Sequence, residues 1–152
     1  MKTFIGAFVL AMGLLCIGLH AQETSSKDNV RFLAVDIYVD SKDKPLAAYQ
    51  LEFSVTNGNA KIVGIEGGEH PAFREAPYYD PKAIQEERVI IAAFSTERAD
   101  NLPLGRTRLA TVHLQLRGIM MSQFSVNLQA AANEVGAPLQ LEVSLVERTP
   151  PK

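Results

Sequence analysis

The side chains that could bind a metal gather in residues 67–87, which read GGEHPAFREAPYYDPKAIQEE, and in the glutamate just before them. His70 stands near Glu66, Glu69 and Asp80, and imidazole together with carboxylates suits divalent cations. The spacing Glu66-x-x-Glu69-His70, however, matches no standard ligand pattern. A solvated acidic loop explains these residues better than a metal site. We therefore expect neither a metal nor a cofactor.

A catalytic residue is equally hard to assign. Nucleophilic catalysis needs a serine or cysteine beside a histidine that a third group orients. The chain has no G-x-S-x-G motif, and its single cysteine, Cys16, lies in an apolar N-terminal stretch. His113 falls on the polar side of an alternating segment, where an exposed strand histidine is the simplest interpretation. We expect a protein without enzymatic activity and without a catalytic residue.

The segment 67–87 is the best candidate for a binding site. It contains Phe73, Tyr78 and Tyr79 close to Arg74, and aromatic and arginine side chains are frequent anchors of interfaces. Alternatively, Phe73 and Tyr78 pack back to plug one end of the domain. Aromatic rings can also stack on sugars, although the absence of tryptophan weakens a polysaccharide-binding interpretation.

Two arginines form a second candidate. Arg106 and Arg108 are two residues apart on a predicted strand, so they share a face and form a small positive stripe. The alternative is a solvated sheet face, or an edge protected by charge. The chain as a whole has 15 Lys+Arg against 17 Asp+Glu, a net charge of -2. This balance disfavours nucleic acid as a partner, because nucleic-acid binding relies on positive charge.

The N-terminus predicts export. Lys2 precedes an apolar stretch over residues 4–19, and Ala21 follows as a small residue, which is the pattern of a secretory signal. The stretch is about 16 residues long, and a membrane-spanning helix needs about 20. No small residue precedes Cys16, as lipidation requires. We expect cleavage after Ala21, no membrane span after cleavage, and a secreted or periplasmic protein.

Most of the remaining chain alternates between apolar and polar residues. A period of two predicts strands with one buried face. Two segments depart from simple alternation. Residues 88–94 are apolar at successive positions, which predicts a central strand buried on both faces. Asp80-Pro81 predicts a short helix through Glu87, because Asp suits the N-cap and Pro the first helical position. The predicted strands cover residues 33–39, 49–55, 61–66, 88–94, 107–117, 124–130 and 139–145.

About seven strands with turns between them, and no long amphipathic helix, predict an all-β fold: an antiparallel two-sheet β-sandwich. A chain of 152 residues accommodates a single domain of this kind. The predicted organisation is a signal peptide over 1–21, a flexible leader over 22–29, the sandwich over 30–147 and a tail over 148–152.

Four segments resemble cohesin domains. Residues 45–55 (PLAAYQLEFSV) resemble the strand that follows the first long cohesin strand, and residues 61–68 (KIVGIEGG) resemble a short strand that ends at a glycine. Residues 88–95 (RVIIAAFS) resemble the central cohesin strand, and residues 104–114 (LGRTRLATVHL) resemble its glycine and alternating strand. The resemblance spans residues 30–147. It implies a jelly-roll sandwich that binds a partner through a sheet face, a dockerin in cellulosomes. The cohesin-like fold is also akin to some carbohydrate-binding modules.

The sequence thus predicts an exported, non-enzymatic binding module. We expect it to engage another exported protein, dockerin-like or other, through a sheet face or the segment 67–87. A carbohydrate-binding module is the first alternative and requires Tyr78 and Tyr79 to be exposed and coplanar. A hydrolase or metal-dependent enzyme requires His70 to meet a carboxylate in a pocket. A structural subunit added by strand exchange requires a long unprotected edge strand.

Overall fold

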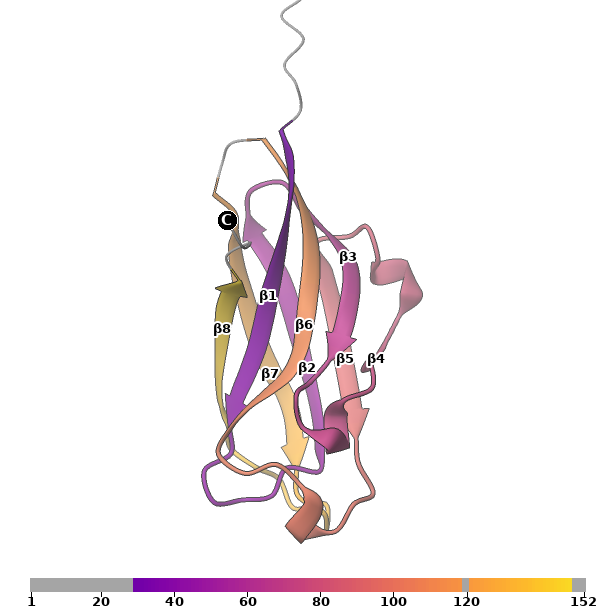
Figure 1. Cartoon of the computed structure of the whole chain (residues 1–152), viewed down its shortest axis with the longest axis vertical. Coiled ribbons are helices and arrows are strands. Elements are labelled where there is room, and N and C mark those ends of the chain that lie inside the picture. The colour runs from indigo at the N-terminus through magenta and orange to yellow at the C-terminus, as the bar shows by residue number, and fades with distance from the viewer. Residues whose placement is uncertain (1–28, 119–120, 149–152) are drawn as a thin grey trace, which may run out of the picture.

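The computed structural model describes residues 29–118 and 121–148, which form a sandwich of two four-stranded antiparallel sheets (Figure 1). Sheet A has the strand order β3-β6-β1-β8, and sheet B has the order β4-β5-β2-β7. The predicted all-β sandwich is therefore confirmed. The strands are β1 (Val30–Asp40), β2 (Ala48–Asn57), β3 (Ala60–Gly67), β4 (Tyr78–Tyr79), β5 (Arg88–Phe94), β6 (Arg106–Arg117), β7 (Gln123–Ala132) and β8 (Glu142–Arg148).

Long-range pairing builds both sheets. The chain changes sheet after every strand except between β4 and β5, so all other neighbours in a sheet are distant in sequence. The only helices among the described residues are three short 3-10 turns, η1 (Pro71–Phe73), η2 (Pro81–Ala83) and η3 (Ala99–Asn101), and none has the length and apolarity to cross a membrane. The predicted signal over 1–21, residues 22–28 of the leader and residues 149–152 of the tail lie outside the described residues.

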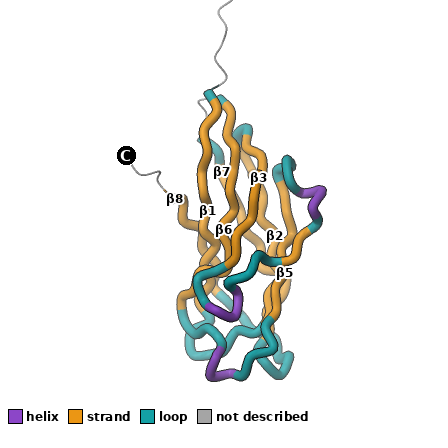
Figure 2. The backbone as a smooth tube through the Cα atoms, turned by 45° about the vertical axis from the view of Figure 1, so that its right-hand side comes forward, coloured by secondary structure: helices purple, strands orange, loops and turns teal. Residues whose placement is uncertain are grey.

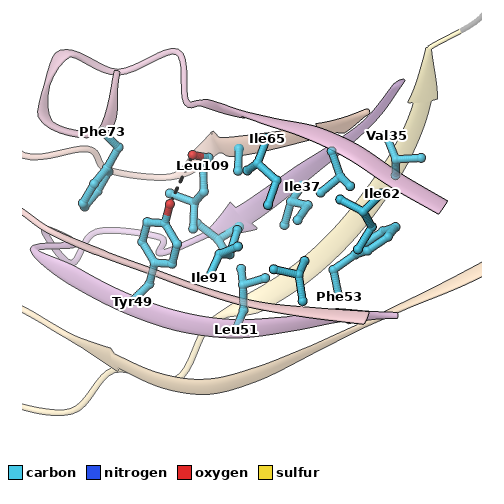
Figure 3. Close-up of a cluster of buried hydrophobic side chains, with 14 of the residues drawn as sticks. Val35, Ile37, Tyr49, Leu51, Phe53, Ile62, Ile65, Phe73, Ile91 and Leu109 are labelled. Carbon is cyan, nitrogen blue, oxygen red and sulfur yellow. Dashed lines mark hydrogen bonds between the residues drawn. The ribbon is translucent and has the colours of Figure 1, made fainter. Parts of the chain in front are cut away.

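The core lies between the two sheets, where the apolar sides of the alternating strands meet (Figure 3). Ile37 on β1 and Leu51 and Phe53 on β2 are completely buried. Tyr49 is a polar member of this core, and its hydroxyl donates to the carbonyl of Leu109 at 3.3 Å. Leu109 is the extra residue of a β-bulge, because Ile37 pairs with Ala110 and Tyr38 with Arg108. The bulge leaves the Leu109 carbonyl available to the tyrosine.

Two strand predictions need correction. β5 was expected to be buried on both faces, but Ile90 is 38% and Phe94 63% exposed. This expectation is wrong because the sandwich has only two sheets, so each sheet, including the one that contains β5, has one face toward solvent. The last strand was expected over 139–145 and runs instead from Glu142 to Arg148. Its start is delayed because Leu139 still belongs to the turn, where its N–H donates to the carbonyl of Ala131 at 2.9 Å.

The helix expected at Asp80 is a single turn. Asp80 caps η2 as predicted, and its Oδ1 accepts from the N–H of Lys82 at 3.0 Å. The turn ends at Ala83, well before Glu87. The following backbone groups bond elsewhere, since the Gln85 N–H donates to the carbonyl of Ile62 at 2.7 Å. Pairing with a strand thus replaces the continuation of the helix.

The two lateral sides of the sandwich differ. On the covered side, flanked by β3 and β5, residues 68–87 lie across the space between the sheets (Figures 1 and 2). This segment includes β4. The carbonyls of Glu86 and Glu87 accept from Ile62 on β3 and Val55 on β2, at 2.9 and 2.8 Å, so this segment is bonded to both sheets. On the open side, formed by β7 and β8, the inward-facing side chains are only partly buried. These are Phe124, Val126, Leu128, Val143 and Leu145.

Candidate functional site

Two aromatic rings stand out on the solvent-facing side of sheet B. Tyr78 on β4 is 70% exposed, and Phe94 at the end of β5 is 63% exposed. Their rings stack with centroids 6.2 Å apart and planes inclined by 11°. Stacking holds the two rings in a fixed relation while most of their surface stays in water.

A shallow depression lies beside the ring pair, and small residues form its floor. The register places Tyr78 beside Ala92, Ala92 beside Gln50, and Gln50 beside Ala130. The depression has a volume of about 310 Å³. Methyl side chains let a ligand approach the sheet closely, next to the rings. We call this the aromatic–alanine surface, formed by Tyr78, Phe94, Ala48, Ala92, Ala130 and Ala132.

Polar side chains border this surface along β2 and its neighbours. Gln50 Nε2 donates to Gln129 Oε1 at 2.6 Å, and Arg88 Nη2 donates to Glu52 Oε2 at 2.6 Å. The hydrogen bond from Arg88 lowers the pKa of the Glu52 carboxyl, so this group stays ionised at neutral pH. The border therefore offers amide groups and a paired charge to a ligand.

The other aromatics of the segment 67–87 point the opposite way. Phe73 is 3% exposed and meets Tyr49 edge-on, with centroids 5.2 Å apart. Tyr79 is partly buried and packs against the core. Phe73 therefore plugs the core, as the alternative interpretation held, whereas Tyr78 does not. Because Tyr78 and Tyr79 face opposite sides of the sheet, they do not form the coplanar pair that a carbohydrate-binding module was expected to show.

Two of the three candidate arginines, Arg106 and Arg108, lie on sheet A and not on the sheet that carries the ring pair. Arg74 is exposed at the end of η1. Arg106 lies on sheet A with its guanidinium 3.7 Å from the centre of the Tyr38 ring. Arg108 is partly buried, and its Nη1 donates to Thr111 Oγ1 at 2.8 Å. Sheet A's outer face therefore holds Arg106 and Arg108, so the six candidate residues do not converge on one site.

Thr111, which accepts a hydrogen bond from Arg108, links this arginine to a buried carboxylate. Asp36 is 5% exposed and accepts from Thr111 Oγ1 at 2.6 Å and from Arg148 Nε at 2.7 Å. Burial alone would raise the pKa of Asp36, but the hydrogen bonds from Arg148 and Thr111 outweigh it and hold the pKa below its ordinary value. This network ties β8 to β1 and β6, which is a structural role.

Each of the two histidines among the described residues has a polar neighbour close to it in the fold. His70 caps η1, where its Nδ1 accepts from the N–H of Ala72 at 3.2 Å. His113 Nε2 lies 3.0 Å from Glu66 Oε1, although the two atoms lack hydrogen-bond geometry. Within residues 29–118 and 121–148, no group of three or more His, Cys, Asp or Glu side chains is placed to hold a metal ion.

A second, more polar depression adjoins Phe94. It has a volume of about 640 Å³ and is lined by residues of both η1 and η3. Its lining includes Glu97, Asp100 and Asn101 besides His70. Phe94 therefore stands between an apolar depression and a polar one.

Comparison with known proteins adds no further constraint: no protein family, curated protein or solved structure matches this chain.

Phe94 is the residue that sequence reasoning missed. The signal was present, since Arg88, Ile90, Ala92 and Phe94 occupy alternate positions of one strand. An alternating reading of this strand would have placed Phe94 on the outer face. Treating the strand as buried on both faces concealed it.

Proposed function

We propose that this chain is an exported, non-enzymatic binding module whose partner protein docks on the aromatic–alanine surface. The observation that carries the proposal is the stacked pair of rings, 70% and 63% exposed, beside an apolar depression. Large exposed rings gain free energy when a partner removes them from water. The resemblance of residues 30–147 to cohesin domains supports docking on a sheet face, with a dockerin-like or other exported partner.

The composition of the surface suits a protein ligand. Interfaces combine an apolar centre rich in aromatics with a polar rim. Tyr78 and Phe94 supply the centre, and Gln50, Glu52 and Arg88 supply the rim. A partner side chain can fill the depression while its neighbours hydrogen-bond to the rim.

The test is affinity capture with matched variants. The chain without its predicted signal, residues 22–152, is immobilised, and the exported proteins of the source cells are passed over it. We expect one protein to be retained and to be lost when Tyr78→Ser is combined with Phe94→Ser. Phe32→Ser is the matched control, because Phe32 is 65% exposed but lies on β1 in sheet A. Loss of the partner with Phe32→Ser, or retention by the double variant, contradicts the proposal.

A carbohydrate-binding module is the second candidate, and the position of Phe94 favours it. Its ring borders the polar depression that holds Glu97, Asp100 and Asn101. Sugars pair an apolar face with hydroxyl groups, so a ring beside carboxylates and an amide suits them. Depletion of the chain by insoluble polysaccharide distinguishes this function. Depletion that Phe94→Ser abolishes, with no protein captured, puts carbohydrate binding in place of protein binding.

A further inference from the structure

The outer edge of β7 has no neighbouring strand in the described part of the chain. β7 is the last strand of sheet B and pairs only with β2. Toward its C-terminal end the turn after β7 covers the edge, since Leu139 bonds to Ala131 and Asn133 to Ala137. The backbone of residues 123–130 thus presents unpaired hydrogen-bonding groups along the edge, interrupted by a bulge at Gln129.

Apart from the bulge at Gln129, this edge lacks the usual protection. Natural sheets place charged residues or proline on exposed edge strands to prevent further pairing. β8 carries Glu142, Glu147 and Arg148, and β3 carries Lys61 and Glu66. The run from 118 to 133, which contains all of β7, has no charged residue and no proline. β7 is therefore the edge strand whose sequence does least to oppose pairing.

The inner face of β7 gives a second reason for pairing. Phe124, Val126 and Leu128 face the core but stay partly exposed. On the covered side, by contrast, Val89 and Ile91 of β5 are only 2% and 0% exposed. A strand added along β7 would extend sheet B across the open side and remove these three side chains from water.

We propose that the occupant is a second copy of this chain, paired antiparallel with β7 around a two-fold axis near Val126. A two-fold contact places each β7 residue opposite another β7 residue, so a charge close to the axis would lie beside its own copy. The uncharged strand avoids this repulsion. It also sets Phe124 near Leu128 of the second copy, so the two inner faces are complementary.

The segments that flank the sandwich in this sequence fit this edge poorly. Residues 22–29, QETSSKDN, are polar and offer no alternating apolar residues to the open side. Residues 149–152, TPPK, contain two prolines, which cannot donate to a ladder. A second β7 supplies both the free backbone groups and the apolar alternation.

Pairing would join two copies of sheet B into one continuous sheet. The two aromatic–alanine surfaces would then lie on the same face, and the two β4 strands that carry Tyr78 would be about seven strand spacings, or roughly 34 Å, apart across the sheet. Two equal sites on one face would bind a partner that carries two copies of the recognised segment more tightly than one site would. This consequence rests on the proposed function, whereas the pairing itself does not.

Sedimentation equilibrium of residues 22–152, which contain every described element, tests the pairing. We expect a reversible dimer with a dissociation constant on the order of 100 µM, because an edge contact is small. Ser125→Lys with Asn127→Lys places positive charges on the edge and should weaken the dimer at least tenfold. Ser144→Lys with Val146→Lys, on the β8 edge, is the matched control and should leave it unchanged. A monomer at all concentrations up to about 1 mM, or a dimer that the β7 variant leaves intact, overturns the proposal.

Hydrogen exchange on the unmodified chain keeps the test decisive if the β7 variant fails to fold. Amides within residues 123–130 should exchange more slowly as the protein concentration rises through the dissociation constant. Those of β8 should not change. Exchange of residues 123–130 that is independent of concentration contradicts the pairing, whatever the variants do.

Discussion

The covered and open sides of the sandwich show two ways of ending a pair of sheets. On the covered side, residues 68–87 bond to both β2 and β3 and place Phe73 in the core. On the open side, β7 and β8 leave Phe124 and Leu145 partly exposed. The least regular segment of the sequence thus completes the core, while two well-formed strands leave it incomplete. The difference shows that regular alternation builds a sheet but does not by itself close a sandwich.

The largest expected effect compares one phenylalanine from each side. Phe73→Ala should lower the free energy of unfolding by about 3 kcal/mol, because it leaves a cavity beside Tyr49. Phe124→Ala should cost about half of that, roughly 1.5 kcal/mol, because its ring is already partly in water. Urea denaturation measures both. Equal losses, or a larger loss at Phe124, would contradict the distinction between the two sides.

The attachment of the covering segment depends on close backbone contact. A Cβ at Gly68 would overlap the carbonyl oxygens of Arg108 and Leu109. Gly68→Ala should therefore cost roughly 2 kcal/mol and raise the proteolytic sensitivity of residues 69–87. Gly64→Ala is the control, because its added Cβ would meet His113 only at an ordinary 3.8 Å. If both alanines are tolerated alike, the covering segment is not held by this contact.

On the open side, a polar network attaches β8 to its neighbour, because Arg148 on β8 donates to the buried Asp36 on β1. Because the pKa of Asp36 is lowered in the folded state, its contribution to stability is present above the ordinary carboxyl range. It is lost as the pH falls below about 4, through the folded-state value. Asp36→Asn should cost roughly 2 kcal/mol at neutral pH, since it disturbs a buried pair with the partly exposed Arg148.

Acid titration of unfolding checks this assignment. Asp36→Asn should flatten the loss of stability between about pH 4 and pH 2. An unaltered acid transition in the Asp36 variant would show that the network does not hold β8 in place.

The smallest effect on stability is expected at the proposed binding surface. Tyr78→Ser should change the free energy of unfolding by less than about 1 kcal/mol, because most of the ring is exposed. Thermal unfolding followed by circular dichroism measures this directly. A large loss would mean that Tyr78 secures the edge of sheet B and is not free to serve binding.

Alternation allowed most strands to be predicted. It identified the inward residues of β1 and β2, such as Ile37 and Leu51, because a period of two reports which face is buried. It could not reveal that Gln85 bonds to Ile62, since such contacts depend on how distant segments meet in space. For the same reason, the helix after Asp80 was expected to be longer than it is.

The candidate site was predictable only in part. Tyr78 was identified because aromatics clustered near it, yet the same cluster included Phe73, which packs in the core. A residue type indicates what a side chain can bind, but not which way it points. The pairing of Tyr78 with Phe94 arises from the register between β4 and β5, which no local pattern encodes.

The most direct test of the account is a hydrogen-exchange footprint of the bound partner. We predict slower exchange within residues 48–50, 92–94 and 130–132, which meet at the aromatic–alanine surface. Exchange in β1 and β6 of sheet A should stay unchanged. Protection confined to sheet A, with none beside Phe94, would contradict the central claim that this protein binds through the outer face of sheet B.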